Sequence, residues 1–445
     1  MDAVILTGGK GRRLGKLTKN LPKPLIKIGS KALIEHQINL LKKCELNKIW
    51  ILSGYLGEKI KDYAGDGSKW SVKIKHVIEA KPLGTAGALK QLDGKINRDF
   101  MVFSGDVMLD MDLNKLVKFH KSKTGNEATI VVHPNDHPFD SDLVAVDKDC
   151  KVTSFLLRRS KSQPKNLLFR NLANAGVFVF SPKIFEFIKK NEFSDLERDI
   201  FPKILTKRKE IYAYNTTEYI KDVGTLARLT TVRHDCNNGK IAKLNLKNKR
   251  KAVFMDRDGT ILKQDGIHDV RLSKFQLYPF TAEAIKKINR AGFLAIVITN
   301  QPAIAKGFIS EAEVELIHKK LETELGNKGA IINGIYYCPH HPKIGFQGEV
   351  KKFKIKCSCR KPKTGLVKKA VLDFNIDLEK SLFIGDSTAD AKCAQNAGIK
   401  FIGVKTGYGL QDNKYKISRN FALFKNLSET VNSAIKKTLC VFSLN

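Results

Sequence analysis

The sequence contains no apolar run of the length that crosses a membrane, and its N-terminus lacks the basic region and long apolar stretch of a secretory signal peptide. Its 8 cysteines are scattered along 445 residues, which argues against the disulfide framework of small secreted proteins. Internal repeats and low-complexity segments are also absent. These absences predict a cytoplasmic globular protein, and its length predicts two or more domains.

Acidic residues are scarce relative to basic ones: 45 Asp and Glu stand against 79 Lys and Arg, a net charge of +34. Such a charge favours nucleic acid, anionic membranes or phosphorylated substrates as partners. The excess is mostly lysine spread along the chain, without the aromatic-interleaved basic patches of nucleic-acid readers. We therefore expect phosphorylated sugars and nucleotides as substrates, and neither nucleic acid nor a membrane as partner.

Two carboxylates follow a short apolar strand in the stretch KAVFMDRDGTI, residues 251–261. Asp256 and Asp258 are spaced by two, so they project from the same side of the strand and emerge together at its C-terminal end. One carboxylate can attack phosphorus while the other protonates the leaving oxygen, and Mg²⁺ shared with a third acid can offset the negative charge. A strand that merely ends in a polar turn is the alternative for this motif alone.

Two later stretches carry phosphate-binding groups. The apolar strand 295–300 ends in Thr299 and Asn300, whose hydroxyl and amide groups can donate to a phosphate oxygen. Arg360 and Lys361 supply cations that can hold the phosphate in the transition state. These groups favour phosphoryl chemistry over the polar-turn alternative.

A fourth stretch, SLFIGDSTAD at residues 381–390, is a strand ending in Asp386, with Asp390 one helical turn beyond. This pair suits Mg²⁺, bound directly or through water. The four stretches, in this order, resemble the haloacid-dehalogenase phosphatases. The resemblance implies a Rossmannoid α/β domain, Lys361 as a catalytic residue and Mg²⁺ held by Asp256, Asp258 and Asp386.

Two motifs narrow this resemblance. GIYYCPHHP at residues 334–342 and CSCRKPKTG at residues 357–365 are similar to the D-glycero-D-manno-heptose 1,7-bisphosphate 7-phosphatases, and the similarity covers residues 251–408. It implies hydrolysis of the 7-phosphate of that sugar, with Thr299, Asn300 and Arg360 as substrate contacts.

Three cysteines and a histidine have metal-ligand spacing. Cys-x-His is followed after sixteen residues by Cys-x-Cys, a composition and pairing suited to tetrahedral Zn²⁺; independent free thiols are the alternative. Four protein ligands leave no open position, so the zinc would be structural and would clamp the loop that carries the two phosphate-binding cations. The predicted ligands are Cys338, His340, Cys357 and Cys359.

The N-terminus places a four-residue apolar strand directly before a glycine-rich loop in MDAVILTGGKGRRL, residues 1–14. The loop has neither the GxGxxG spacing of a dinucleotide site nor the GK[ST] of a Walker loop, and a mobile surface turn is its alternative reading. Its glycines let backbone N–H groups approach a triphosphate, and nearby cations can pair with the phosphate oxygens. The residues concerned are Gly8, Gly9, Gly11, Arg13 and Lys23.

GGKGRRL and LPKPL, followed by alternating helix and strand patterns, resemble the sugar-1-phosphate nucleotidyltransferases. The resemblance implies a Rossmann-like, glycosyltransferase-A-like α/β fold and one Mg²⁺ held by Asp106 and Asp222. It further implies Arg13 and Lys23 as catalytic residues, and sugar or base contacts from Gly84, Thr85, Asn174 and Gly176.

Glu79 stands before the PLGTAGAL stretch of that family. A carboxylate there can accept from both N1–H and the 2-amino group of guanine, whereas adenine offers no such donor pair, so GTP is favoured. A solvent-facing glutamate beside a turn is the alternative. Where the family usually has Glu-Lys to grip the sugar phosphate, this chain has Arg158 and Arg159, and either arginine could serve instead.

The predicted organisation is a nucleotidyltransferase domain at 1–236, a polar and basic linker at 237–250, a phosphatase domain with a zinc-binding loop at 251–408, and a tail at 409–445. In the tail, apolar residues recur every four positions and would form one face of a helix. We expect that face to pack on the protein body or on a second subunit rather than to contact a membrane. That face consists of Leu427, Val431, Ile435 and Leu439.

Together these motifs predict a bifunctional enzyme that removes the 7-phosphate of heptose 1,7-bisphosphate and transfers GMP from GTP to heptose 1-phosphate, a step toward surface polysaccharide such as lipopolysaccharide. The same fusion acting on mannose 1-phosphate or another nucleotide is the first alternative. Nucleic-acid 3′-end processing is a second; it is opposed by the absence of a KxDG ligase lysine. A non-catalytic regulatory subunit is the third.

Overall fold

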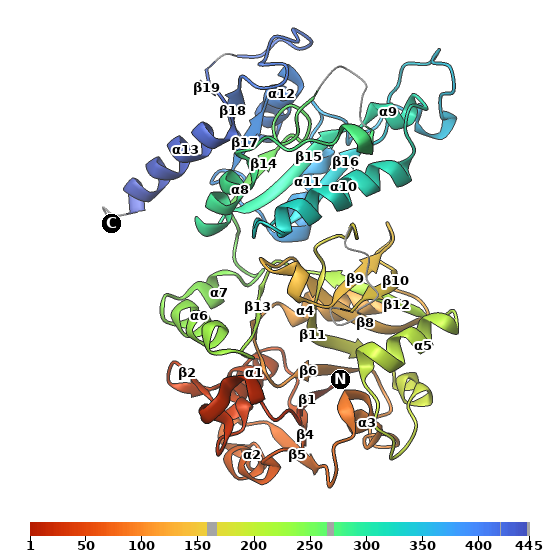
Figure 1. Cartoon of the computed structure of the whole chain (residues 1–445), viewed down its shortest axis with the longest axis vertical. Helices are drawn as coiled ribbons and strands as arrows, with labels where there is room; N and C mark the ends of the chain where they lie inside the picture. Colours follow the sequence, from red (N-terminus) through yellow and green to blue (C-terminus); the bar gives the residue numbers. More distant parts are fainter. Residues whose placement is uncertain (158–166, 265–270, 419, 443–445) are drawn as a thin grey trace. The chain divides into compact units, whose positions relative to one another are not determined.

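The computed structural model describes residues 1–157, 167–264, 271–418 and 420–442. These residues divide into two compact units (Figure 1). The first lies within Met1–His133, Ser141–Lys161 and Leu172–Asn248, and the second within Pro134–Asp140, Ser162–Asn171 and Lys249–Asn445. The boundary between Asn248 and Lys249 therefore falls inside the predicted linker, 237–250. Two linker residues, Ile241 and Leu246, are buried. The predicted ends of the domains stay predictions.

The first unit is built on a nine-stranded mixed sheet with β1 at its centre. The order is β10-β9-β11-β6-β1-β4-β5, with β8 between β11 and β12. β1, β4, β5 and β6 run parallel, whereas β11 is antiparallel to β6. The strands are β1 Asp2–Thr7, β4 Lys48–Ser53, β5 Lys73–Ile78, β6 Phe100–Ser104, β8 Asn126–His133, β9 Leu143–Val146, β10 Val152–Leu156, β11 Ala173–Phe180 and β12 Glu210–Asn215.

Helices cover both faces of this sheet, so its central strands are apolar throughout. Val4 of β1 packs into one core layer, while its neighbours Ala3 and Ile5 pack into the other. A two-stranded sheet, β7 Val107–Asp110 with β13 Tyr219–Asp222, lies outside the main one. The helices are α1 Leu33–Lys43, α2 Gly57–Ala64, α3 Gly84–Lys90, α4 Leu113–Lys121, α5 Phe201–Thr206, α6 Leu226–Asn237 and α7 Lys240–Lys243.

The second unit is a six-stranded parallel sheet in the order β16-β15-β14-β17-β18-β19. Side chains alternate between its faces: Val253 and Met255 of β14 enter one core layer, Ala252 and Phe254 the other. The strands are β14 Ala252–Met255, β15 Leu294–Asn300, β16 Gly334–Cys338, β17 Leu382–Gly385, β18 Lys400–Val404 and β19 Ala422–Phe424, and the helices are α8 Thr281–Arg290, α9 Pro302–Ala305, α10 Glu311–Gly326, α11 Gly365–Phe374, α12 Thr388–Ala397 and α13 Leu427–Phe442.

The tail helix α13 packs beside α8 (Figure 1). Leu427 and Val431 are buried in a core layer of the second unit. The predicted packing on the protein body is therefore confirmed for these two residues, while the side chains of Ile435 and Leu439 lie outside the described ones. Among the described helices, none combines the length and the apolar character that crossing a membrane requires.

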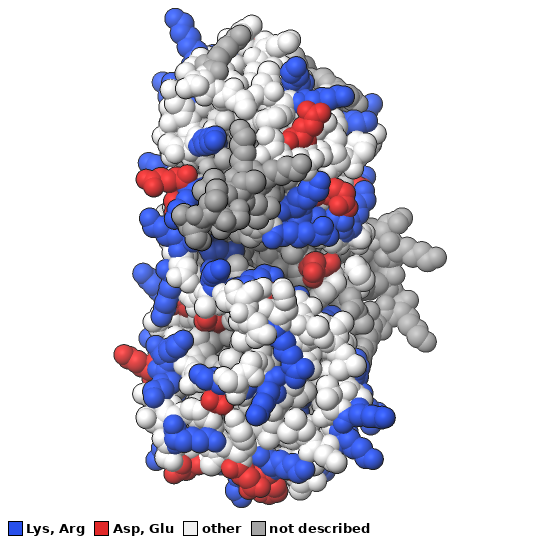
Figure 2. Space-filling model, turned by 90° about the vertical axis from the view of Figure 1, so that its left-hand side faces the viewer, with Lys and Arg blue, Asp and Glu red and all other residues white. Residues whose placement is uncertain are grey.

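Lysine and arginine side chains are spread over the face of the protein that Figure 2 shows. They do not gather into a single basic stripe there. This distribution agrees with the spread of lysine along the sequence.

Both predicted α/β domains are thus confirmed. In a parallel sheet the C-terminal ends of neighbouring strands meet at one edge, which is where such folds bind ligands. That edge in the second unit carries the predicted phosphatase residues.

Candidate active sites and candidate zinc centre

Three buried carboxylates converge at the C-terminal edge of the second sheet. Asp256 follows β14 and Asp386 follows β17, and these two strands are paired. Asp390 lies in the first turn of α12, where Ser387 forms a capping box with it. One oxygen from each carboxylate lies within 4.8 Å of the others, and all three residues are buried. The sequence had predicted that Asp386 and Asp390 bind Mg²⁺ directly or through water, and the structure brings both residues to Asp256.

Lys361 is the cation that faces this group. Its Nζ lies 2.9 Å from Asp256 Oδ1 and 2.6 Å from Asp390 Oδ1, and it donates to the Ile298 carbonyl at 2.8 Å. Burial, with the negative charge of Asp390 nearby, raises the pKa of Asp256 to about 7. The pKa of Asp386 is also raised, by burial first and then by Asp256 and Asp390.

Three carboxylates against one ammonium leave an excess of negative charge in a buried place. The donors are all oxygens, which are the ligands that Mg²⁺ prefers, and a divalent cation would relieve their mutual repulsion. The residues Asp256, Asp386 and Asp390 therefore fit Mg²⁺.

Asp258 is held apart from these three carboxylates by its own partners. Its carboxylate accepts from the Arg257 guanidinium at 2.9 Å on each oxygen and from Gln301 Nε2 at 2.8 Å. Burial would raise the pKa of Asp258, but the Arg257 charge and the hydrogen bonds from Arg257 and Gln301 together lower it below its usual value. The predicted Mg²⁺ ligands Asp256, Asp258 and Asp386 therefore share two residues with this group, which has Asp390 in place of Asp258; the Asp258 side chain binds Arg257.

The two predicted phosphate contacts at the end of β15 have structural partners. Asn300 donates to the Lys361 carbonyl at 3.1 Å and accepts from the Lys361 N–H at 3.0 Å, so it fixes the backbone of the cation. The Thr299 hydroxyl accepts from Gln301 Nε2 at 2.9 Å. Arg360 donates to the His340 carbonyl at 3.2 Å.

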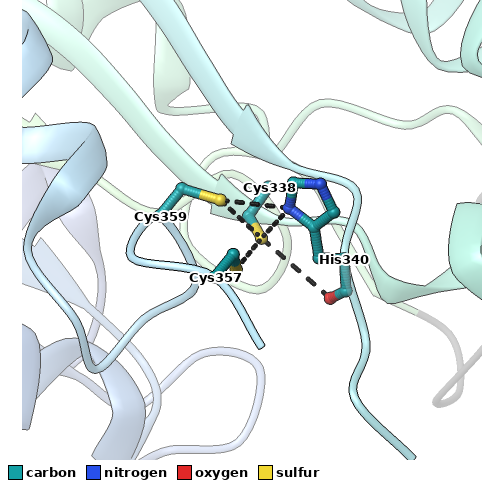
Figure 3. Close-up of side chains that lie close together, drawn as sticks. All are labelled: Cys338, His340, Cys357 and Cys359. Atoms are coloured by element: carbon teal, nitrogen blue, oxygen red, sulfur yellow. Dashed lines mark hydrogen bonds between the residues drawn. The ribbon is translucent and has the colours of Figure 1, made fainter. Parts of the chain in front are cut away.

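The four predicted zinc ligands lie together, as Figure 3 shows. Cys338 Sγ lies 3.6 Å from Cys357 Sγ and 3.2 Å from Cys359 Sγ, and His340 Nδ1 lies 3.2 Å from Cys359 Sγ. Hydrogen bonds, chiefly from Cys338, lower the pKa of the Cys359 thiol to about 5. Sulfur and imidazole donors at these separations fit a tetrahedral Zn²⁺, and Cys359 directly precedes Arg360 and Lys361.

In the first unit a cavity of about 340 Å³ opens beside the glycine-rich loop. It gathers residues that the sequence places far apart, from the ends of β1 and β6, the start of α3 and the loop before α5. Of the predicted site residues it is lined by Gly8, Gly9, Lys23, Glu79, Gly84, Thr85 and Asp106.

Lys23 and Asp106 form an ion pair at 2.7 Å on the wall of this cavity. Lys23 is buried, and prolines on both sides hold its backbone. Glu79 lies beside the loop, since a Cβ on Gly8 would stand 3.6 Å from Glu79 Oε2. Burial raises the pKa of Glu79, which suits a group whose partner is a ligand.

Asp222, the other predicted metal ligand of this unit, binds Arg228 at 2.5 Å and accepts from the Gly224 N–H at 2.9 Å. Burial would raise the pKa of Asp222, but Arg228, the Gly224 N–H and Arg13 together lower it. The Val223 N–H donates to the Asp106 carbonyl at 2.9 Å, so the two aspartates stand on adjoining backbone. Each of these two carboxylates is thus paired with a cation.

Asn174 and Gly176 lie on β11. The Asn174 amide donates to Glu197 at 2.5 Å, and its oxygen accepts from the Gly176 N–H, where φ is 67°. Sequence reasoning missed Glu197 and its neighbour Asp195, which lines the cavity. Burial, followed by the charges of Asp142 and Asp195, raises the pKa of Glu197 to about 8. Arg158 and Arg159, the proposed grip on the sugar phosphate, lie outside the described residues.

Two separate regions of the chain resemble known protein families. A Nucleotidyl transferase model matches residues 2–239, and a HAD-hydrolase-like model matches residues 358–430. The chain is 38% identical over 161 residues to the D-glycero-beta-D-manno-heptose-1,7-bisphosphate 7-phosphatase of Haemophilus ducreyi, covering 36% of this chain and 85% of that protein. The chain belongs to the nucleotidyl transferase family and to that of the heptose bisphosphate 7-phosphatases.

The names of two nucleotidyl transferase relatives specify different sugar phosphates and different nucleotides. The mannose-1-phosphate guanyltransferase of Debaryomyces hansenii is 34% identical over 231 residues, covering 50% of this chain and 61% of that protein. The UTP–glucose-1-phosphate uridylyltransferase of a Synechocystis strain is 31% identical over 238 residues, covering 50% of this chain and 60% of that protein. The chain therefore spans less than two thirds of these two relatives. The predicted resemblance to both families is confirmed, and the chain combines a nucleotidyl transferase domain with a phosphatase domain.

Proposed function

We propose that the protein is a bifunctional enzyme of nucleotide-activated heptose synthesis. Its phosphatase domain would remove the 7-phosphate of D-glycero-D-manno-heptose 1,7-bisphosphate. Its nucleotidyl transferase domain would then join GMP from GTP to the heptose 1-phosphate, giving GDP-heptose and pyrophosphate. The product of the first reaction is the substrate of the second, which accounts for the fusion of the two domains.

The observation that carries the phosphatase half is the buried group of Asp256, Asp386, Asp390 and Lys361, present in a chain that covers most of a heptose bisphosphate phosphatase. We assign Asp256 as the nucleophile, because its oxygen faces Lys361 at the end of β14. The carboxylate attacks phosphorus, the bond from phosphorus to the sugar oxygen breaks, and that oxygen takes a proton from Asp258. Water then cleaves the aspartyl phosphate and returns a proton to Asp258.

Asp256, Asp386 and Asp390 would hold Mg²⁺, which when bound supplies positive charge against the phosphate oxygens. Lys361 supplies the same charge from the protein, and Asn300 fixes its backbone. The carboxylate of Asp256 remains available for attack because the ammonium stands beside it.

Cations near the zinc loop favour a substrate that carries a second phosphate. Lys306 and Lys354 both lie over the Phe346 ring, at 4.7 and 4.6 Å from its centre. Burial, and then the charge of Arg360, lowers the pKa of Lys306. Lys354 is paired with Glu349 at 3.1 Å, so Lys306 beside Arg360 is the cation that an added anion would stabilise, which favours a bisphosphate over a sugar with one phosphate.

For the transfer half, the glycine-rich loop, Arg13 and Lys23 would hold the triphosphate, and Glu79 would accept from guanine. Asp106 and Asp222 would hold Mg²⁺, which supplies charge at the α-phosphate. Both substrates are anionic, so the enzyme's main task is to neutralise and align them. Mannose 1-phosphate with GTP is the second candidate, favoured by the 34% identity to a mannose-1-phosphate guanyltransferase.

The position of phosphate loss tests the phosphatase assignment. Incubation with heptose 1,7-bisphosphate and Mg²⁺, followed by phosphorus NMR, should show loss of the 7-phosphate and an intact 1-phosphate. Loss of the 1-phosphate first would contradict the proposal, because the transferase would then have no substrate.

A further inference from the structure

Arg257 stands between the two aspartates of the catalytic strand end and is only 1% exposed. Its guanidinium forms a fork on Asp258: Nε donates to Oδ1 at 2.9 Å and one terminal nitrogen donates to Oδ2 at 2.9 Å. Such a planar pair fixes the carboxylate in rotation as well as position. A buried ion pair of this kind adds little net stability compared with apolar residues of similar size, so stability alone does not account for the pair.

The remaining terminal nitrogen of Arg257 points to His318 on α10, with 3.0 Å to Nε2. Arginine can only donate, so Nε2 must accept and the imidazole proton must lie on Nδ1. Burial lowers the pKa of His318 to about 4, which keeps the ring neutral. Nδ1 faces Glu315 at 3.9 Å, and Glu315 in turn accepts from Arg170. His318 thus holds the one guanidinium nitrogen of Arg257 that does not bind Asp258.

The contacts on Asp258 distinguish its two oxygens. Oδ2 accepts from both Arg257 and Gln301, whereas Oδ1 accepts from Arg257. Because each carboxylate oxygen has two lone pairs, these contacts leave room for a proton on Oδ1. Oδ1 is therefore the oxygen of Asp258 that keeps a lone pair free to take up and release a proton.

We propose that Arg257 and His318 are positioning residues that aim Oδ1 of Asp258 at the leaving oxygen of the phosphate ester. This inference rests on the proposed role of Asp258 as the general acid. The step itself is unchanged: Asp256 bonds to phosphorus, the bond to the sugar oxygen breaks, and the proton moves from Asp258 to that oxygen. Neither Arg257 nor His318 touches the substrate.

The test compares two leaving groups in the full-length enzyme with Mg²⁺. A sugar oxygen must be protonated as it leaves, whereas a nitrophenolate leaves readily without a proton. The measured quantity is kcat/KM, which covers the steps up to formation of the aspartyl phosphate and excludes its hydrolysis. The variants are His318→Leu, which removes the acceptor for Arg257, and His318→Gln, which offers an amide oxygen in its place.

His318→Leu should lower kcat/KM for heptose 1,7-bisphosphate at least tenfold, and that for p-nitrophenyl phosphate less than about threefold, because general acid catalysis is worth at least about a hundredfold when fully lost. His318→Gln should recover most of the loss. An equal fall with both esters would show a merely structural role and overturn the inference, as would no fall with either. GMP transfer by the same preparations reports on protein quality.

Asp258→Asn separates this inference from its premise. If Asp258→Asn lowers kcat/KM much more for the heptose bisphosphate than for p-nitrophenyl phosphate while His318→Leu does not, Asp258 is the general acid but Arg257 and His318 do not position it. If Asp258→Asn does not discriminate, the acid assignment fails, and the positioning role fails with it.

Discussion

Lys361 places its ammonium nitrogen 2.9 Å from Asp256 and 2.6 Å from Asp390, so one buried cation joins the proposed nucleophile to a proposed Mg²⁺ ligand. The two carboxylates come from different elements, the end of β14 and the first turn of α12. In the proposed reaction, negative charge moves from the Asp256 carboxylate to the phosphate, and the Lys361 ammonium would stabilise it in both places from one position.

Replacing the nucleophile should separate the two activities. Asp256→Asn keeps the size of the side chain but removes the attacking oxygen's charge, so phosphate release should fall by several orders of magnitude. GMP transfer in the same preparation should be unchanged, because it depends on residues of the other domain. Phosphate release at the wild-type rate would refute the assignment.

Zinc should be present at one ion per chain and should be structural. Chelation or Cys357→Ser should lower the thermal stability of the phosphatase domain and slow phosphate release, because the zinc loop carries Arg360 and Lys361. Cys393→Ser is the matched control: this thiol is buried but lies outside the zinc group, so zinc content should persist. Elemental analysis of protein purified without added zinc measures the content, and finding none would reject the site.

Nucleotidyl transfer should be a single displacement without a covalent enzyme intermediate. Lys23→Ala and Asp222→Ala should each depress GMP transfer strongly while phosphate release continues; Lys27→Ala, an exposed lysine nearby, should not. One in-line attack inverts the configuration at the α-phosphorus. With a chiral α-thio analogue of GTP, retention in the nucleotide sugar would instead demand two displacements.

Glu197 should make the stability of the nucleotidyl transferase domain fall as pH rises. Its pKa is about 8 in the folded protein against an ordinary 4.5. Between these values the folded state binds a proton that the unfolded chain has released, so the free energy of unfolding drops with rising pH, by at most about 1.4 kcal/mol per pH unit.

Glu197→Gln, which has no ionisable proton, should flatten this dependence. Both tryptophans, Trp50 and Trp70, lie in that domain, so their fluorescence during urea unfolding at pH 5.5 and 7.5 reports on it alone. An unchanged pH dependence in the variant would show that Glu197 is already ionised in the folded state.

Local sequence patterns were sufficient to predict both sheets and many of the residues that the structure brings together at the candidate sites. Apolar runs marked the central strands, and a carboxylate or amide directly after such a run marked the sheet edge, as at Asp256 and Asn300. Paired Cys and His spacing likewise predicted the four residues that Figure 3 shows together. The strand-end signals lie within a few residues of the features they predict, and the Cys and His pairs were predictable because each pair has metal-ligand spacing of its own.

Partners chosen across long separations in the sequence were not predictable in this way. Asp258 binds its own neighbour Arg257, but His318, some sixty residues later, fixes that arginine. Glu197 lies on no recognisable motif, and only the folded sheet brings it to Asn174. Both cases depend on which face of a helix or loop reaches the site, which a single sequence does not specify.

The measurement that bears most directly on the whole account is a one-pot reaction of the full-length protein with heptose 1,7-bisphosphate, Mg²⁺ and one nucleoside triphosphate at a time, with products read by mass. GTP should give GDP-heptose together with phosphate and pyrophosphate, and Asp256→Asn should yield no nucleotide sugar until heptose 1-phosphate is supplied. A nucleotide sugar formed with UTP or ATP but not GTP, or one formed from mannose 1-phosphate but not from heptose 1-phosphate, would contradict the account.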